Sequence, residues 1–163
     1  MVILGGGDED QQIAALLHDA IEDQATAPDG RVTADIILEK FGQRVSDYVW
    51  ACTDGLPGET RDAGSWKKRK EHHIAELREL ASKDASVLTV SIADKLSNAQ
   101  AIVADVTQHG DIVWQRFNAK PDQILWYYQQ MLDLFESFID PRNTLLHRYR
   151  RVVSEMQQLV QSK

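Results

Sequence analysis

Apolar residues recur along most of the chain with the spacing of an amphipathic helix. The first run covers residues 8–21, where Asp8 is expected to cap the helix and Gln11, three residues later, to complete a capping box. At about 100° per residue, this run separates into a core-facing side and a polar side. The core-facing side comprises Ile13, Leu16, Leu17, Ala20 and Ile21. The polar side comprises His18, Asp19, Glu22 and Asp23.

Two short helices are expected next. Thr33 is placed to cap one of them, which ends at Gly42, and residues 43–53 form the other. Residues 54–64 contain three glycines and a proline, so this segment is predicted to be an irregular loop.

The second half of the chain predicts longer helices. Ser65 is expected to cap the first, whose inward stripe comprises Ile74, Leu77 and Leu80. Residues 85–106 are apolar on nearly every side in their first half, which predicts a central buried helix, and Asp94 lies within it. Pro121 and Pro141 are each expected to begin a further helix. No segment has the alternation of a strand, so the prediction is an all-α bundle of about seven or eight helices.

Length and composition favour one domain over residues 1–163. The 18 basic and 25 acidic residues give a net charge of −7, which argues against a general binder of nucleic acid or anionic membrane. A single cysteine, Cys52, rules out an intrachain disulfide and suits a reducing compartment. No apolar run approaches the roughly 20 residues of a membrane span. We therefore expect a cytoplasmic protein.

The acidic residues around His18 are unfavourably placed for a helix alone. Asp19, Glu22 and Asp23 crowd the predicted C-terminal turn, where the helix dipole is negative, and a bound cation would reverse that penalty. Asp94 would be costly to bury unless it bound a metal or paired with a lysine or arginine. These residues predict a metal site formed by His18, Asp19 and Asp94, with a solvated polar face and an Asp94 ion pair as the alternatives.

Two segments carry a resemblance to a known family. LLHDAIED, at residues 16–23, resembles the His-Asp and Glu-Asp signature of the HD-domain phosphohydrolases, and SIADKLSNA, at residues 91–99, resembles their distal Asp-x-x-x-Asn element. Within that family the chain looks most like the SpoT-type alarmone hydrolases, over most of residues 8–139.

The resemblance implies roles for the residues of both segments. His18, Asp19 and Asp94 would bind a divalent ion, usually manganese in this branch. Glu22 and Asp23 would orient or deprotonate the attacking water. Asn98, one helical turn after Asp94, would help to position the site.

The resemblance also implies a substrate, a guanosine tetra- or pentaphosphate that loses its 3′-pyrophosphate. Arg69 and Lys70 match a basic pair of the family and would contact phosphates, whereas Lys67 and Lys68 are interpreted as solvated charges. The adjacent histidines His72 and His73 match no family ligand and are interpreted as surface or interface residues.

One family feature has no counterpart in this sequence. The family contributes a further histidine ligand from a helix upstream of the His-Asp segment, and residues 1–7 resemble only the end of that helix. The chain is therefore expected to be either truncated or a degenerate member with a weakened site. The leading prediction is a metal-dependent hydrolase of nucleotide polyphosphates. The alternative is a non-catalytic, HD-like module that binds a nucleotide or a protein, and a homodimer is compatible with either.

Overall fold

The computed structural model describes residues 1–21, 34–54 and 63–161. These parts contain seven α-helices, three 3₁₀ helices and no β-strand, which confirms the predicted all-α bundle. Its elements are η1 (Val2–Gly5), α1 (Glu9–Leu17), α3 (Ala34–Phe41), α4 (Gln43–Cys52), α5 (Ala63–Lys83), η2 (Ala85–Val87), α6 (Leu88–His109), η3 (Gly110–Arg116), α7 (Pro121–Phe138) and α8 (Thr144–Gln161). None of the described helices has the length and apolar character needed to cross a bilayer.

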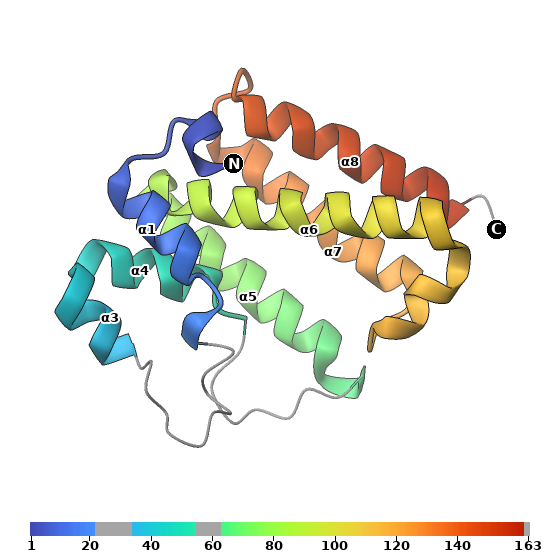
Figure 1. The fold of residues 1–163 in the computed structure, drawn as a ribbon, viewed down its shortest axis with the longest axis horizontal. Helices are drawn as coiled ribbons and strands as arrows, with labels where there is room; N and C mark the ends of the chain where they lie inside the picture. Colours follow the sequence, from blue (N-terminus) through green and yellow to red (C-terminus); the bar gives the residue numbers. More distant parts are fainter. Residues whose placement is uncertain (22–33, 55–62, 162–163) are drawn as a thin grey trace.

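Helix α6 is the central element, as the sequence predicted. It crosses the middle of the fold, packs most extensively on α8, and also contacts α7, α1 and α4 (Figure 1). Leu96 and Ala99 of α6 are fully buried, as are Met131 of α7 and Tyr149 of α8. Since these helices share one core, α6 is held on several sides, and the polar residues that it carries have fixed positions.

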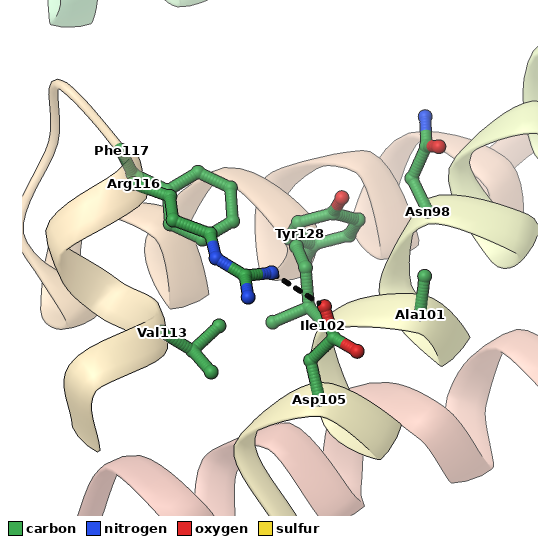
Figure 2. Close-up of a pocket in the computed structure, with 8 residues that line it drawn as sticks. All are labelled: Asn98, Ala101, Ile102, Asp105, Val113, Arg116, Phe117 and Tyr128. Carbon is green, nitrogen blue, oxygen red and sulfur yellow. Dashed lines mark hydrogen bonds and ion pairs between the residues drawn. The ribbon is translucent and has the colours of Figure 1, made fainter. Parts of the chain in front are cut away.

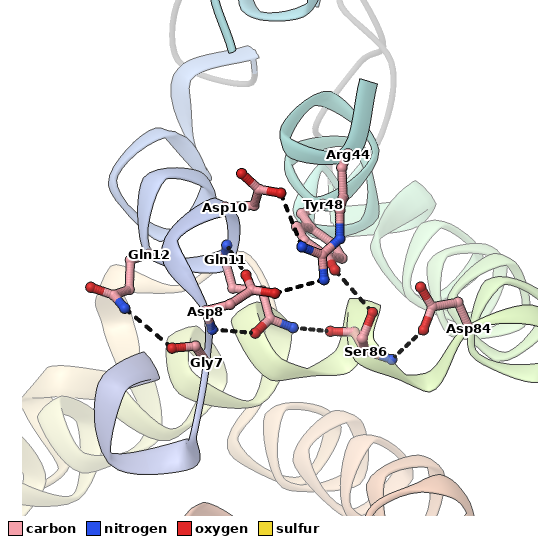
Figure 3. Close-up of polar contacts among 9 residues, drawn as sticks. All are labelled: Gly7, Asp8, Asp10, Gln11, Gln12, Arg44, Tyr48, Asp84 and Ser86. Carbon is pink, nitrogen blue, oxygen red and sulfur yellow. Dashed lines mark hydrogen bonds and ion pairs between the residues drawn. The ribbon is translucent and has the colours of Figure 1, made fainter. Parts of the chain in front are cut away.

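The start of α1 confirms the predicted capping box. The Gln11 backbone N–H donates to Asp8 Oδ1 at 3.0 Å, and the Asp8 backbone N–H donates to Gln11 Oε1 at 3.0 Å. Gln11 is also buried, and its amide Nε2 donates to the backbone carbonyl of Ser86 at 2.8 Å (Figure 3). The cap therefore fixes α1 to the segment that leads into α6.

Arg44 of α4 reinforces this attachment. Its guanidinium contacts Asp8 at 2.7 Å and Asp10 at 3.0 Å, and it lies over the ring of Tyr48 (Figure 3). The Tyr48 hydroxyl is in turn 2.9 Å from Ser86 Oγ. Together these contacts tie α1, α4 and η2 into one unit.

Several predicted boundaries are wrong. Helix α5 begins at Ala63, so Ser65 lies inside the helix and does not cap it. The last helix begins at Thr144, after a turn that contains Pro141. Leu80 is exposed, because the buried positions of α5 are His73, Leu77 and Ala81. The predicted cap at Thr33 and most of the predicted 54–64 loop lie outside the described residues.

Candidate metal centre

The His-Asp pair lies in a turn and not inside a continuous helix. Helix α1 ends at Leu17, His18 and Asp19 form the turn, and helical structure resumes at Ala20. His18 Nδ1 donates to the carbonyl of Ala15 at 2.9 Å. In a continuous helix that carbonyl would accept the backbone N–H of Asp19, so the imidazole competes with the helix at this point.

Burial in α1, just before this turn, also differs from the prediction. Leu16, predicted to face the core, is 87% exposed, whereas Ala14 is fully buried. Ile21 is buried as predicted, and Ile13 and Leu17 are half-buried. The inward side of α1 is therefore rotated relative to the stripe that the sequence predicted.

The structure brings His18, Asp19 and Asp94 together. His18 Nε2 lies 3.0 Å from Asp19 Oδ2 and 3.3 Å from Asp94 Oδ1. Because Nδ1 is used by the Ala15 carbonyl, Nε2 is the ring nitrogen that faces both carboxylates. Residues distant in sequence, at the end of α1 and in the middle of α6, thus form one polar cluster.

Asp94 has two further partners within α6. Lys95 Nζ contacts Asp94 Oδ2 at 2.7 Å, and Asn98 Nδ2 donates to Asp94 Oδ1 at 2.8 Å. The Asp94 side chain is only 9% exposed, so these contacts compensate a carboxylate that would otherwise be costly to bury. The sequence alone left open whether Asp94 binds a metal or pairs with a lysine or arginine. In the structure it pairs with Lys95.

The electrostatics of the cluster favour its charged forms. The hydrogen bond to Asp94 outweighs burial and raises the pKa of His18 to about 9. Burial opposes ionisation of Asp94, yet the hydrogen bond with His18 and the charge of Lys95 outweigh burial and lower the pKa of Asp94. In the absence of a metal, the cluster is thus a protonated imidazole between two carboxylates.

The three side chains fit a divalent ion in chemistry and in spacing. Two ligands about 2.1 Å from an octahedral ion, at right angles to each other, lie about 3.0 Å apart. The separations of 3.0 and 3.3 Å about His18 Nε2 are close to this value. A histidine ligand also commonly donates its other ring N–H to a backbone carbonyl, as His18 does to Ala15.

The cluster is nevertheless not a finished metal site. Among the described residues, no group of three or more His, Cys, Asp or Glu side chains is already arranged to hold a metal ion. Since the raised pKa of His18 favours its protonated form, an ion bound between the carboxylates would have to replace the Nε2 proton. Glu22 and Asp23, predicted to act on the attacking water, lie outside the described residues.

The predicted phosphate-binding residues lie on α5. Lys70 forms an ion pair with Asp54, and its ammonium lies 4.6 Å from the centre of the Tyr127 ring. Arg69 Nε donates to Ser65 Oγ at 3.4 Å within the same helix. Lys70 would therefore have to exchange a buried partner for a phosphate, and its proposed contact with substrate stays a prediction.

The interpretation of both adjacent histidines as surface or interface residues is wrong for His73. His72 is exposed and contacts Glu76, but His73 is 4% exposed. Burial, together with the positive charge of Lys95, lowers the pKa of His73 to about 4. His73 lies four residues before Leu77 on the inward face of α5, a spacing that could have identified it as buried.

A pocket of about 340 Å³ lies beside the cluster, between α6, η3 and α7. It begins at Asn98, the same residue that donates to Asp94, and extends along α6 to Asp105, which pairs with Arg116 at 2.8 Å (Figure 2). The pocket is lined by Asn98, Ala101, Ile102, Asp105, Val113, Arg116, Phe117 and Tyr128. The sequence did not identify this pocket, because its far wall comes from η3.

Comparisons with known proteins show the family and the fold of this chain. Residues 1–125 match a family model described as an HD domain. The fold resembles the crystal structure of lmo0812 from Listeria monocytogenes EGD-e, with a TM-score of 0.74 and 27% sequence identity over 98% of this chain and 92% of that chain. No curated protein matches the sequence. Since the family model spans well over half of its length, the chain belongs to the HD-domain family, whose members are generally metal-dependent hydrolases.

Proposed function

We propose that this protein is a metal-dependent phosphohydrolase of nucleotide polyphosphates, with the 3′-pyrophosphate of guanosine 3′,5′-bis(diphosphate) as the leading candidate for the group removed. The observation that carries the proposal is the position of His18 Nε2, which faces Asp19 and Asp94 at the spacing of neighbouring metal ligands. Manganese is the first ion to test, since mixed imidazole and carboxylate ligands suit it.

In this proposal His18, Asp19 and Asp94 hold the ion, which when bound would polarise a phosphoryl oxygen. Asn98 orients Asp94 through the 2.8 Å hydrogen bond to Oδ1. The two acidic residues that follow in the sequence, Glu22 and Asp23, would orient the attacking water and accept its proton.

The pocket beside the cluster supports an organic phosphate as substrate. It adjoins Asp94 through Asn98, and it combines the Phe117 ring with the polar groups of Asp105 and Arg116. An aromatic surface with a few polar groups is typical of sites for the organic part of a ligand. Arg69 and Lys70 of α5 are the proposed contacts for the phosphates.

The test is pyrophosphate release from guanosine tetraphosphate by the full chain, with and without Mn²⁺. Activity should require Mn²⁺ and should fall to background in His18→Ala. The matched control is His72→Ala, which removes an exposed histidine of α5 that forms an ion pair with Glu76. Glu22→Gln should lower the rate with little change in Mn²⁺ binding. Release that needs no Mn²⁺, or that survives in His18→Ala, would refute the proposal.

A non-catalytic module is the second candidate. It is favoured by the Lys95 contact, which already compensates Asp94 without a metal. This alternative predicts that Mn²⁺ leaves the melting temperature unchanged, and that Asp94→Ala alters no ligand binding. The proposed enzyme instead predicts that Mn²⁺ raises the melting temperature, because an ion that binds only the folded state stabilises it.

A further inference from the structure

Lys95 is an unusual lysine, because its charge is enclosed in the bundle beside the proposed metal centre. Its side chain is 12% exposed, and its ammonium contacts Asp94 Oδ2 at 2.7 Å. Tyr127 of α7 and Cys52 of α4 also interact with its charge. A buried ammonium is costly without a partner, and the contact with Asp94 compensates that cost.

The two oxygens of Asp94 have separate tasks. Oδ2 is held by Lys95, whereas Oδ1 accepts from Asn98 and faces His18. Lys95 therefore holds the carboxylate through Oδ2, and Oδ1 remains directed toward His18. An ion bound between His18 and Asp94 would share that carboxylate with a positive charge on its opposite side.

Lys70, the other lysine near Asp94 in the described parts of the chain, already has a carboxylate partner. Lys70 and Lys95 both act on the charge of His73, which places them in one buried neighbourhood. Lys70, however, is paired with Asp54. If Lys95 lost its charge, Lys70 could not take its place, and His18 would be the one cationic side chain still in contact with Asp94 among the described residues.

We propose that Lys95 is the internal counter-ion of the metal centre: through its 2.7 Å contact it orients the Asp94 carboxylate when no metal is bound, and its positive charge lowers the affinity of the centre for a divalent cation. The physical reason is that the ammonium and the cation compete for the charge of one buried carboxylate and repel each other. This role rests on the proposed metal site, and it concerns affinity and assembly of the site, not the chemical step.

Titration of the full chain with Mn²⁺, followed by electron paramagnetic resonance of the free ion, tests this role. Lys95→Met keeps a similar side-chain length and removes the charge. Its Kd for Mn²⁺ should be at least about tenfold lower than that of the wild type. Lys95→Arg keeps the charge and should stay within about threefold of the wild type. Lys83→Met is the matched control, because Lys83 is an exposed lysine paired with Glu79, and it should leave the Kd unchanged.

The outcomes separate the two proposals. If the wild type binds no Mn²⁺, the metal centre itself is wrong, and the role of Lys95 falls with it. If the wild type binds Mn²⁺ but Lys95→Met binds it equally or more weakly, only the counter-ion role is wrong. If Lys95→Met does not fold in metal-free buffer, Mn²⁺ should restore its helical circular dichroism, since the ion would replace the missing charge. Failure of that rescue would also overturn the role of Lys95.

Discussion

His18 should make the stability of the metal-free protein depend on pH. The hydrogen bond to Asp94 raises its pKa to about 9, whereas the ordinary value in an unfolded chain is about 6.5. The protonated imidazole therefore stabilises the folded state fully below about pH 6.5. That contribution is lost as the pH rises through about 9, where the folded protein also releases the proton.

The size of the effect follows from the two pKa values. Their difference corresponds to at most about 3 kcal/mol, since one pKa unit equals about 1.4 kcal/mol. The His18 side chain is 27% exposed and that of Asp19 is 56% exposed, so solvent screens part of the interaction. We therefore expect a loss of about 1–2 kcal/mol between pH 6.5 and pH 9.5.

Urea unfolding in the presence of a chelator, at several pH values across this range, measures the effect. His18→Gln removes the titrating group and should show a flatter dependence of the unfolding free energy on pH. His72→Gln, at an exposed position, should follow the wild type. If His18→Gln loses as much stability as the wild type over this range, the contact between His18 and Asp94 does not have the strength described.

Two further substitutions test the packing. Met131→Ala, at a fully buried position of α7, should lower the unfolding free energy by about 2–5 kcal/mol, whereas Ser97→Ala on the exposed side of α6 should change it by less than about 0.5 kcal/mol. Gln11→Ala removes a buried amide that donates to the Ser86 carbonyl and accepts from the Asp8 backbone N–H, and it should cost about 1–3 kcal/mol in urea unfolding because both hydrogen bonds are lost. A Met131→Ala effect as small as the control would mean that this core is poorly packed, and a neutral Gln11→Ala would mean that the link to Ser86 contributes nothing.

The parts of the fold that depend on local rules could be predicted from the sequence. The capping box of Asp8 and Gln11 involves neighbouring residues, and the proline at the first turn of α7 needs no distant partner. The burial of individual residues was less predictable. A helix phase inferred from a few apolar residues placed Leu80 inside and His73 outside, whereas contacts with other helices selected the opposite orientation.

The candidate site could be predicted only in part, for a similar reason. His18 and Asp94 are recognisable because each is an ionisable residue beside an apolar helical stripe. The resemblance to HD domains then predicted that the two residues belong to one site. The break after Leu17 depends on the bond between the His18 ring and a backbone carbonyl, which no periodicity encodes. The pocket depends on how η3 folds back against α6, which is a tertiary contact.

The shared face of α6 has a consequence for how such proteins can diverge. Asp94, Asn98, Ala101 and Asp105 follow one another on a single side of one unbroken helix. Inserting or deleting one residue between Asp94 and Asp105 would rotate the pocket residues by about 100° relative to the cluster of His18, Asp19 and Asp94. The pocket can therefore change by substitution at these positions, but the number of residues between them is constrained by helical register, unlike the length of a loop.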